Sequence, residues 1–261
     1  MLKRLKKLFG MEGLRWTDYI QDTVIIHLKK DVERKSSLDI RLDKVKTGES
    51  TTLKDDSRYF DAIDTTMLNK FPKGIVERTY EFDYHYEIDS HRTLQDYFGK
   101  GLTIDVSDSE MAIALSHYSV WKEIIEKKTP STLILEDDVD INPYIMKKLS
   151  YIMDNELPKD YDILYLSYTF SHTPLIQEFS ENLEKAKRGV WWLSGYIVSY
   201  EGAKKLMKGL PIKDAVDVWI NHQFSDMNVF LMKGWPIYQT HETKSNNDWS
   251  FHNKYYRGTI Y

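Results

Sequence analysis

The chain has 261 residues, a length that fits one large α/β domain or two small ones. Its formal net charge of −4 gives no basic excess, so nucleic acid is not expected as a partner. It contains no cysteine, which excludes disulfides, thiolate catalysis and cysteine-ligated metals. The lack of cysteine also fits a reducing compartment, so we expect a cytoplasmic protein.

Residues 1–20 form a separate N-terminal segment in our prediction, basic and amphipathic over its first nine residues, with apolar side chains at Leu2, Leu5, Leu8 and Phe9. A helix of this kind can lie on an anionic membrane surface, so residues 1–10 are a candidate peripheral membrane contact. The alternative is a frayed or locally packed terminal helix. We expect neither a signal peptide nor a span across a bilayer, because no stretch is apolar enough.

The first predicted strand covers residues 23–28, where β-branched and apolar residues follow one another almost without a break. A charged run follows, and apolar residues between 38 and 45 then predict a helix. Residues 46–58 are polar and rich in Ser, Thr and Asp, so we expect a loop there. A short second strand is predicted at 60–64, whereas residues 70–100 show no clear periodicity.

A capping box predicts the start of a long helix, since Ser107 is followed three residues later by Glu110. Apolar residues then recur at helical spacing until about residue 128, and residues 133–135 follow as a short apolar strand. In open α/β sheets, ligands bind beyond the carboxyl ends of the strands, so a site is expected at the end of this strand. Three adjacent carboxylates stand there: Glu136, Asp137 and Asp138.

Further helices are predicted after residue 142 and at 202–209, and further strands at 162–167 and 191–199. Strands that alternate with helices indicate a largely parallel sheet. We find no internal repeat, low-complexity tract or linker in the sequence. We therefore expect an α/β fold in which residues 21–261 form a single domain.

The acidic cluster suits a divalent cation. Three adjacent carboxylates repel one another, and at a strand end they cost stability unless a cation neutralises them. Oxygen ligands suit Mg²⁺ or Mn²⁺. Such an ion can bridge a diphosphate and neutralise the charge that develops on it as a leaving group. The alternative is a solvated acidic turn, but the apolar strand before the cluster favours a site.

A series of segments carries motifs in a recognisable order: residues 24–28 with Arg34, 60–64, 110–117 with Trp121, 133–139, 161–166, 195–199, 202–206 and Asp217. In this order they resemble glycosyltransferase family 25, which includes bacterial lipooligosaccharide galactosyltransferases and collagen hydroxylysine galactosyltransferases. The resemblance runs from about residue 24 to about residue 239. Ala112-Ile113 stand where the family has Gly-Cys, which indicates a divergent branch.

The resemblance implies a GT-A fold, a Rossmann-like and mostly parallel sheet flanked by helices. It also implies an inverting transfer from a UDP- or GDP-sugar to a hydroxyl of a glycan or glycoprotein acceptor, with Mn²⁺ or Mg²⁺ as cofactor. On this basis we predict Asp138 and Glu136 as metal ligands and Asp217 as the catalytic residue. The predicted donor-binding residues are His27, Lys29, Arg34, Asp64, Ser116, His117, Glu136 and Asp137.

The sequence leaves alternatives open for several of these residues. Lys29 and Arg34 are either charge-assisted donors to a diphosphate or ordinary surface charges. Asp64 is a candidate partner for the ribose or the base. His117 lies at the margin of an apolar helix face, where it either bonds a phosphate or the acidic loop, or packs between helices.

The predicted catalytic base stands in an apolar stretch, since Asp217 has Val216 and Val218 beside it. A desolvated carboxylate there would have a raised pKa, which suits a general base, although a helix-capping or surface role is the alternative. Asp214 is the second candidate. Trp191 and the adjacent tryptophan form either an acceptor platform or part of the core.

Two other functions compete with glycosyl transfer at this level. One is a glycosyltransferase-like binding or adhesion protein that has lost turnover. The other is a metal-dependent phosphohydrolase, which would release a nucleoside monophosphate instead of a diphosphate.

Overall fold

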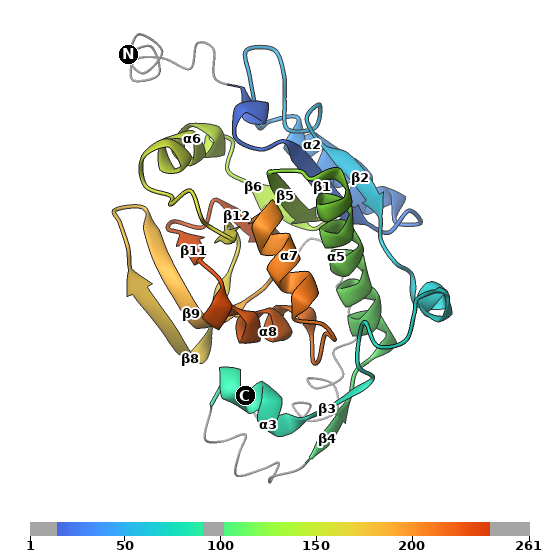
Figure 1. Ribbon diagram of the computed structural model, residues 1–261. Helices are drawn as coiled ribbons and strands as arrows, with labels where there is room; N and C mark the ends of the chain where they lie inside the picture. Colours follow the sequence, from blue (N-terminus) through green and yellow to red (C-terminus); the bar gives the residue numbers. More distant parts are fainter. Residues whose placement is uncertain (1–14, 91–101, 241–261) are drawn as a thin grey trace.

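The computed structural model describes residues 15–90 and 102–240 (Figure 1). An eight-stranded sheet lies at its centre, in the order β2-β1-β5-β10-β7-β11-β9-β8. Its strands are β1 (Asp22–His27), β2 (Arg58–Asp61), β5 (Ser131–Glu136), β7 (Ile163–Tyr165), β8 (Thr169–Glu178), β9 (Leu183–Trp191), β10 (Gly195–Ser199) and β11 (Val229–Met232). Two small sheets pair β3 (Thr79–Glu81) with β4 (Thr103–Asp105), and β6 (Val139–Ile141) with β12 (Ile237–Gln239).

Helices cover both faces of the large sheet, and each face has its own apolar core. One core includes side chains of α5 (Asp108–Lys127), α7 (Tyr200–Lys208) and α8 (Val216–Trp219). The other includes α2 (Val32–Leu42) and α6 (Ile145–Asn155). Figure 1 shows α5 and α7 side by side over the sheet. The remaining helices in the described residues are α3 (Phe82–Ile88) and the 3₁₀ helices η1 (Trp16–Asp18), η2 (Thr65–Lys70) and η3 (Ile220–Asp226).

The α/β prediction is confirmed, but the expectation of a mostly parallel sheet is wrong for the part of the chain that the structure describes. Strand β1 pairs in parallel with β2 and β5, and β7 with β11. Strand β10 runs antiparallel between β5 and β7, and β9 is antiparallel to both β11 and β8. The sheet is mixed because β10 runs against β5 and β7, and because residues 169–191 form a long hairpin, β8–β9, where sequence periodicity indicated no strand before residue 191.

The parallel pair β1 and β5 positions the acidic cluster. Both strands are buried almost throughout, which explains their unbroken apolar runs. Their register places Ile26 opposite Glu136, so both carboxyl ends meet at one edge of the sheet. The predicted capping box is confirmed: Ser107 Oγ accepts from the Glu110 backbone N–H at 3.2 Å, and Glu110 accepts from Ser107 N–H at 2.8 Å. Helix α5 therefore begins as expected.

The domain begins before residue 21, the boundary that the sequence suggested. Trp16, Tyr19 and Ile20 are buried in the core that also contains α2 and α6. The candidate membrane contact, residues 1–10, lies outside the described residues. No helix in the described ranges is long and apolar enough to cross a membrane. Residues 70–100, where the sequence shows no clear periodicity, contain β3 and α3 among the residues that the structure describes.

Candidate active site

A cavity of about 910 Å³ opens beyond the carboxyl ends of β1 and β5, within the size range of small-molecule sites. Its lining comes mainly from two groups of elements. One group follows β1 and β5 or belongs to α2 and α5. The other belongs to α3, β9, α8 and the segment that leads into α8. The acidic cluster lies in the first group and Asp217 in the second, so one cavity holds both predicted centres.

Asp137 is held by two basic side chains from β1 and α2. Its Oδ2 lies 2.7 Å from His27 Nδ1, and its Oδ1 accepts from Arg34 Nη1 at 2.8 Å. All three side chains are buried. Burial is the largest single influence and lowers the pKa of Arg34, but the charge and hydrogen bond of Asp137 and the charges of Asp138 and Asp31 together outweigh it, so the net shift of the pKa is upward. Asp137 thus fixes Arg34 in the cavity wall, and its two oxygens are already engaged.

Asp138 differs from its neighbour because only one of its side-chain oxygens is bonded. Oδ2 accepts from Gln239 Nε2 at 2.9 Å, while buried Oδ1 has no hydrogen-bond partner among the described residues. Burial raises the pKa of Asp138 to about 6, and the nearby charge of Glu136 acts in the same direction. A buried, unsatisfied carboxylate oxygen is costly, which makes Asp138 Oδ1 a suitable cation ligand.

The described residues test how a metal would be held. Within residues 15–90 and 102–240, no group of three His, Asp or Glu side chains could hold a metal ion. Two carboxylates are nevertheless close, Asp138 and the partly exposed Glu136. Mg²⁺ at phosphate sites takes one or two carboxylates and completes its shell with waters and substrate phosphates. Asp138 and Glu136 therefore fit such a cation, provided that a ligand supplies the remaining oxygens.

His117 and Ser116 come from the middle of α5, beneath the cavity. His117 Nδ1 lies 2.9 Å from the Tyr196 hydroxyl, and its Nε2 is 3.7 Å from Glu136 Oε1. Ser116 Oγ donates to the Ala112 carbonyl at 2.8 Å and accepts from Ile63 N–H at 2.9 Å. Ser116 therefore anchors the segment that carries the next cavity residue, Asp64.

The cationic residue after β1 is one position further along than predicted. Lys29 is exposed and does not line the cavity, whereas Lys30 lines it and forms an ion pair with Asp64. That bond is the main cause of the lowered pKa of Asp64, which also caps η2 through Thr66 N–H. The turn after β1 points Lys29 to solvent. His27 does not line the cavity. It contacts the lining through its bond to Asp137.

Asp217 stands on α8 with its carboxylate in the second part of the lining. Its Oδ2 accepts from Trp192 N–H at 3.2 Å, and burial raises the pKa of Asp217 to about 6. The alternative candidate, Asp214, is bonded instead to His85: their Nδ1 and Oδ2 are 2.6 Å apart. Asp217 is the better candidate because, within the described chain, its carboxylate is bonded by backbone N–H groups, those of Trp192 and of Asp217 itself, and by no basic side chain.

Trp191 and Trp192 both line the cavity. Trp191 stacks on the His85 ring with centroids 5.8 Å apart, and Trp192 has a positive φ of 73°. Such a backbone conformation is unusual for a bulky residue and marks a position that the surrounding structure constrains. Both side chains are half-buried in the cavity lining rather than fully buried in the core.

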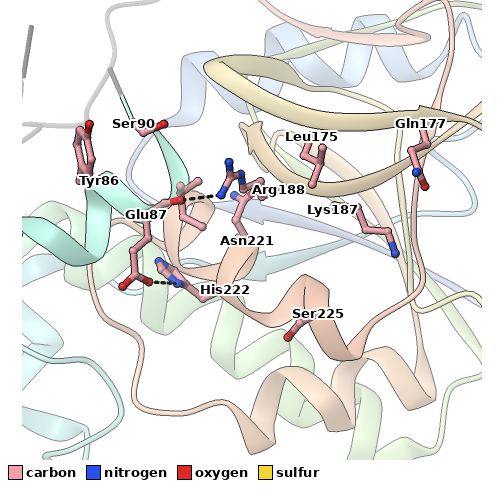
Figure 2. A pocket seen from close by; sticks show the side chains of 11 residues that line it. Tyr86, Glu87, Ser90, Leu175, Gln177, Lys187, Arg188, Asn221, His222 and Ser225 are labelled. Carbon is pink, nitrogen blue, oxygen red and sulfur yellow. Dashed lines mark hydrogen bonds and ion pairs between the residues drawn. The ribbon is translucent and has the colours of Figure 1, made fainter. Parts of the chain in front are cut away.

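A second, more open cavity of about 790 Å³ lies between α3, the β8–β9 hairpin and η3 (Figure 2). Figure 2 shows Arg188 directed at the Glu87 carbonyl, 3.5 Å away, and His222 Nδ1 at 3.7 Å from the Glu87 carboxylate. At its inner wall, Asn221 bonds both Val190 backbone groups and donates to the Asp217 carbonyl at 2.7 Å. These contacts tie α8 to β9 and so help to hold Asp217.

Similarity to known proteins identifies the family of this chain. Residues 20–220 match the family model described as glycosyltransferase family 25, LPS biosynthesis protein. The chain belongs to glycosyltransferase family 25. The resemblance inferred from the sequence motifs is thus confirmed.

Curated relatives of this family 25 chain are distant and much longer. Procollagen galactosyltransferase 2 from Homo sapiens is 30% identical over 154 residues, which cover 51% of this chain and 25% of the relative. A glycosyltransferase 25 family member from Drosophila melanogaster is 26% identical over 200 residues, covering 74% of this chain and 29% of the relative. The chain therefore spans about a quarter of the length of the relatives it matches. Mouse xyloside xylosyltransferase 1, in its apo form, aligns over 84% of this chain and 97% of its own, with 9% identity and a TM-score of 0.38.

Within this family 25 chain, most of the predicted site residues share one cavity. Lys29 and His27 are the exceptions described above. Sequence reasoning missed Lys30, His85 and Gln239, and no local pattern marked the last two. The predicted residues that line the cavity are Arg34, Asp64, Ser116, His117, Glu136, Asp137, Asp138 and Asp217.

Proposed function

We propose that this family 25 protein transfers a sugar from a nucleotide diphosphate donor to a hydroxyl of a glycan or glycoprotein, with a GT-A type site and a divalent cation. The donor is a UDP- or GDP-sugar, and it occupies the part of the cavity beyond β1 and β5. The family membership supports the reaction class. We further propose that the protein acts in the cytoplasm, with residues 1–10 as a peripheral membrane contact.

The first part of the cavity has the positive charges that a nucleoside diphosphate needs. Arg34 is immobilised by Asp137, and Lys30 stands next to Asp64 on the same wall. Cationic side chains held in place are effective donors to phosphate oxygens. Asp138 and Glu136 would hold the cation, which when bound neutralises charge on the leaving diphosphate. Asp64 is then the candidate partner for the ribose or the base.

Asp217 serves as the general base on the acceptor side. It takes the proton of the acceptor hydroxyl as that oxygen forms its bond to the anomeric carbon. The bond from that carbon to the diphosphate breaks, and the electron pair leaves with the diphosphate. Attack opposite the leaving group inverts the configuration at the anomeric carbon. The raised pKa of Asp217, about 6, supports this role because an efficient base has a pKa near the working pH.

The observation that carries the metal-dependent proposal is the buried Asp138 Oδ1, which has no hydrogen-bond partner in the described ranges and lies beside Glu136. Isothermal titration of UDP and GDP in Mn²⁺, Mg²⁺ or EDTA tests it. We expect at least about tenfold tighter binding with one of the metals, a difference of about 1.4 kcal/mol. Equal affinity in EDTA would contradict metal-dependent donor binding.

A product assay separates the proposed reaction from hydrolysis of the bond between the two phosphates of the donor. Glycosyl transfer releases a nucleoside diphosphate, and chromatography of the nucleotide products identifies it. Release of the monophosphate would instead indicate a phosphohydrolase.

A further inference from the structure

A chain of buried hydrogen bonds links the core beneath α5 to Glu136. Trp121 Nε1 donates to the Tyr196 hydroxyl at 2.9 Å, and the same hydroxyl lies 2.9 Å from His117 Nδ1. On the other side of the ring, His117 Nε2 is 3.7 Å from Glu136 Oε1. Trp121, Tyr196 and His117 are at most 1% exposed, so water does not compete for these groups.

The chemistry of the three groups allows only one order of donors and acceptors along this series of hydrogen bonds. An indole N–H can only donate, so the Tyr196 oxygen accepts from Trp121. The Tyr196 O–H must then find an acceptor, and His117 Nδ1 is the group within reach among the described residues. If Nδ1 carried the proton, the buried Tyr196 O–H would have no acceptor in that part of the chain, which is costly. His117 Nε2 would also direct a lone pair toward the Glu136 carboxylate.

We propose that Trp121 and Tyr196 are positioning residues that fix His117 as the Nε2–H tautomer, so that its N–H orients the Glu136 carboxylate in the cavity. The distance of 3.7 Å is too long for a hydrogen bond. Such contacts often tighten only when substrate is bound. Groups that orient metal-ligating carboxylates commonly change metal affinity or activity by 10- to 100-fold when removed. The inference rests on the proposed role of Glu136 as a metal ligand.

The tautomer can be measured without turnover. In ¹⁵N-labelled protein, long-range ¹H–¹⁵N correlation spectra distinguish a protonated from an unprotonated ring nitrogen, and a His117→Gln variant assigns the signals. We expect an unprotonated Nδ1 and a protonated Nε2 in the wild type. Tyr196→Phe should convert His117 to a mixture of tautomers. A protonated Nδ1 in the wild type, or an unchanged tautomer in Tyr196→Phe, would overturn the proposal.

Tyr165→Phe is a matched control. Tyr165 lies directly opposite Tyr196 on β7 and is equally buried, but its hydroxyl has no hydrogen-bond partner in the described structure. Its removal should leave the His117 signals in place. If both variants change the tautomer equally, repacking of the sheet is the cause and the proposed role of Tyr196 is wrong.

The contact with Glu136 has its own test. Glu136→Gln should shift the His117 Nε2 resonance, whereas Asp140→Asn, whose carboxylate bonds Tyr238 instead, should not. An unchanged resonance in Glu136→Gln would refute the orienting role. With UDP and Mn²⁺ as the probe, Tyr196→Phe should weaken binding about tenfold and Tyr165→Phe should not. If the wild type binds no UDP, the proposed function fails while the ring-nitrogen results still decide the tautomer.

Discussion

Single residues in the cavity differ in how their charge is compensated. Asp137 lies between Arg34 and His27, so its charge is matched inside the protein. Asp138 is compensated less, because its Oδ2 lies 3.8 Å from an Arg34 guanidinium that already bonds Asp137, and Asp217 has no ion pair among the described residues. Burial raises the pKa of each to about 6. Neighbouring carboxylates can therefore have different tasks: one holds the wall together, whereas the others remain ready for a ligand.

Replacing Asp138 with Asn should abolish transfer without unfolding the protein. Activity should fall at least about 10²-fold, the scale for losing one major electrostatic element. In EDTA the variant should be as stable as the wild type or more so, because a desolvated charge beside Glu136 is removed. Activity assays and thermal melts measure both, with Asp140→Asn as the control outside the cavity lining. A variant that melts early and keeps its specific activity would show that Asp138 is structural.

Asp217→Asn should lower transfer by about 10²–10⁴-fold, the usual contribution of a general base, and leave donor affinity nearly unchanged. Because the base must be ionised, wild-type turnover should fall as the pH drops below about 6. Steady-state kinetics at saturating donor measure both effects. Weakened nucleotide-sugar binding with intact turnover would instead assign Asp217 to the donor site.

The raised pKa of Asp217 also predicts how the stability of the protein changes with pH. The pKa of Asp217 is about 6 in the folded protein and about 3.8 when unfolded, so the unfolded chain releases its proton first as the pH rises. Ionisation of Asp217 therefore costs stability as the pH rises from about 4, and the cost is complete above about 6. Asp217→Asn should consequently melt at a higher temperature than the wild type at pH 7.5 and lose that advantage at pH 4. Melts at both values check the sign.

At the scale of elements, α7 depends on a close approach to the strand beneath it. A Cβ at Gly202 would lie 2.3 Å from the Asp162 carbonyl oxygen, which belongs to the backbone just before β7. Backbone cannot move aside as a side chain can. The glycine is thus required by packing, since its φ is not in the left-handed region.

Gly202→Ala should therefore lower the free energy of unfolding by about 1–3 kcal/mol, the usual cost of overpacking. Urea denaturation measures it. Gly209→Ala, at the C-terminal end of the same helix, is the control, because its Cβ would meet the flexible end of Gln223. Equal stability of the two variants would show that α7 can shift on the sheet.

At the scale of the whole molecule, the segment before β1 completes the core on the α2 and α6 face. Trp16 is 1% exposed, and its Nε1 donates to Thr23 Oγ1 at 2.9 Å. Tyr19 bonds Asp154 at the end of α6 in the same region. The α/β domain thus includes residues that the sequence suggested were a separate segment.

Trp16→Ala should cost about 3–5 kcal/mol of stability, as expected for removing a fully buried aromatic side chain. Denaturant unfolding checks this, with Trp235→Ala as a control because that tryptophan is 58% exposed. A loss below about 1 kcal/mol for Trp16→Ala would mean that the domain does begin near residue 21.

The sequence by itself determined the features that depend on neighbours along the chain. The apolar runs of β1 and β5, the capping box of α5 and the acidic cluster after β5 follow local periodicity, and all were predicted. The tertiary structure alone decided the mixed strand order and the partners of each carboxylate. Asp137 bonds His27 across 110 positions, and Asp214 bonds His85 across 129. Local periodicity does not record such pairs, because they form only when distant segments pack against one sheet edge.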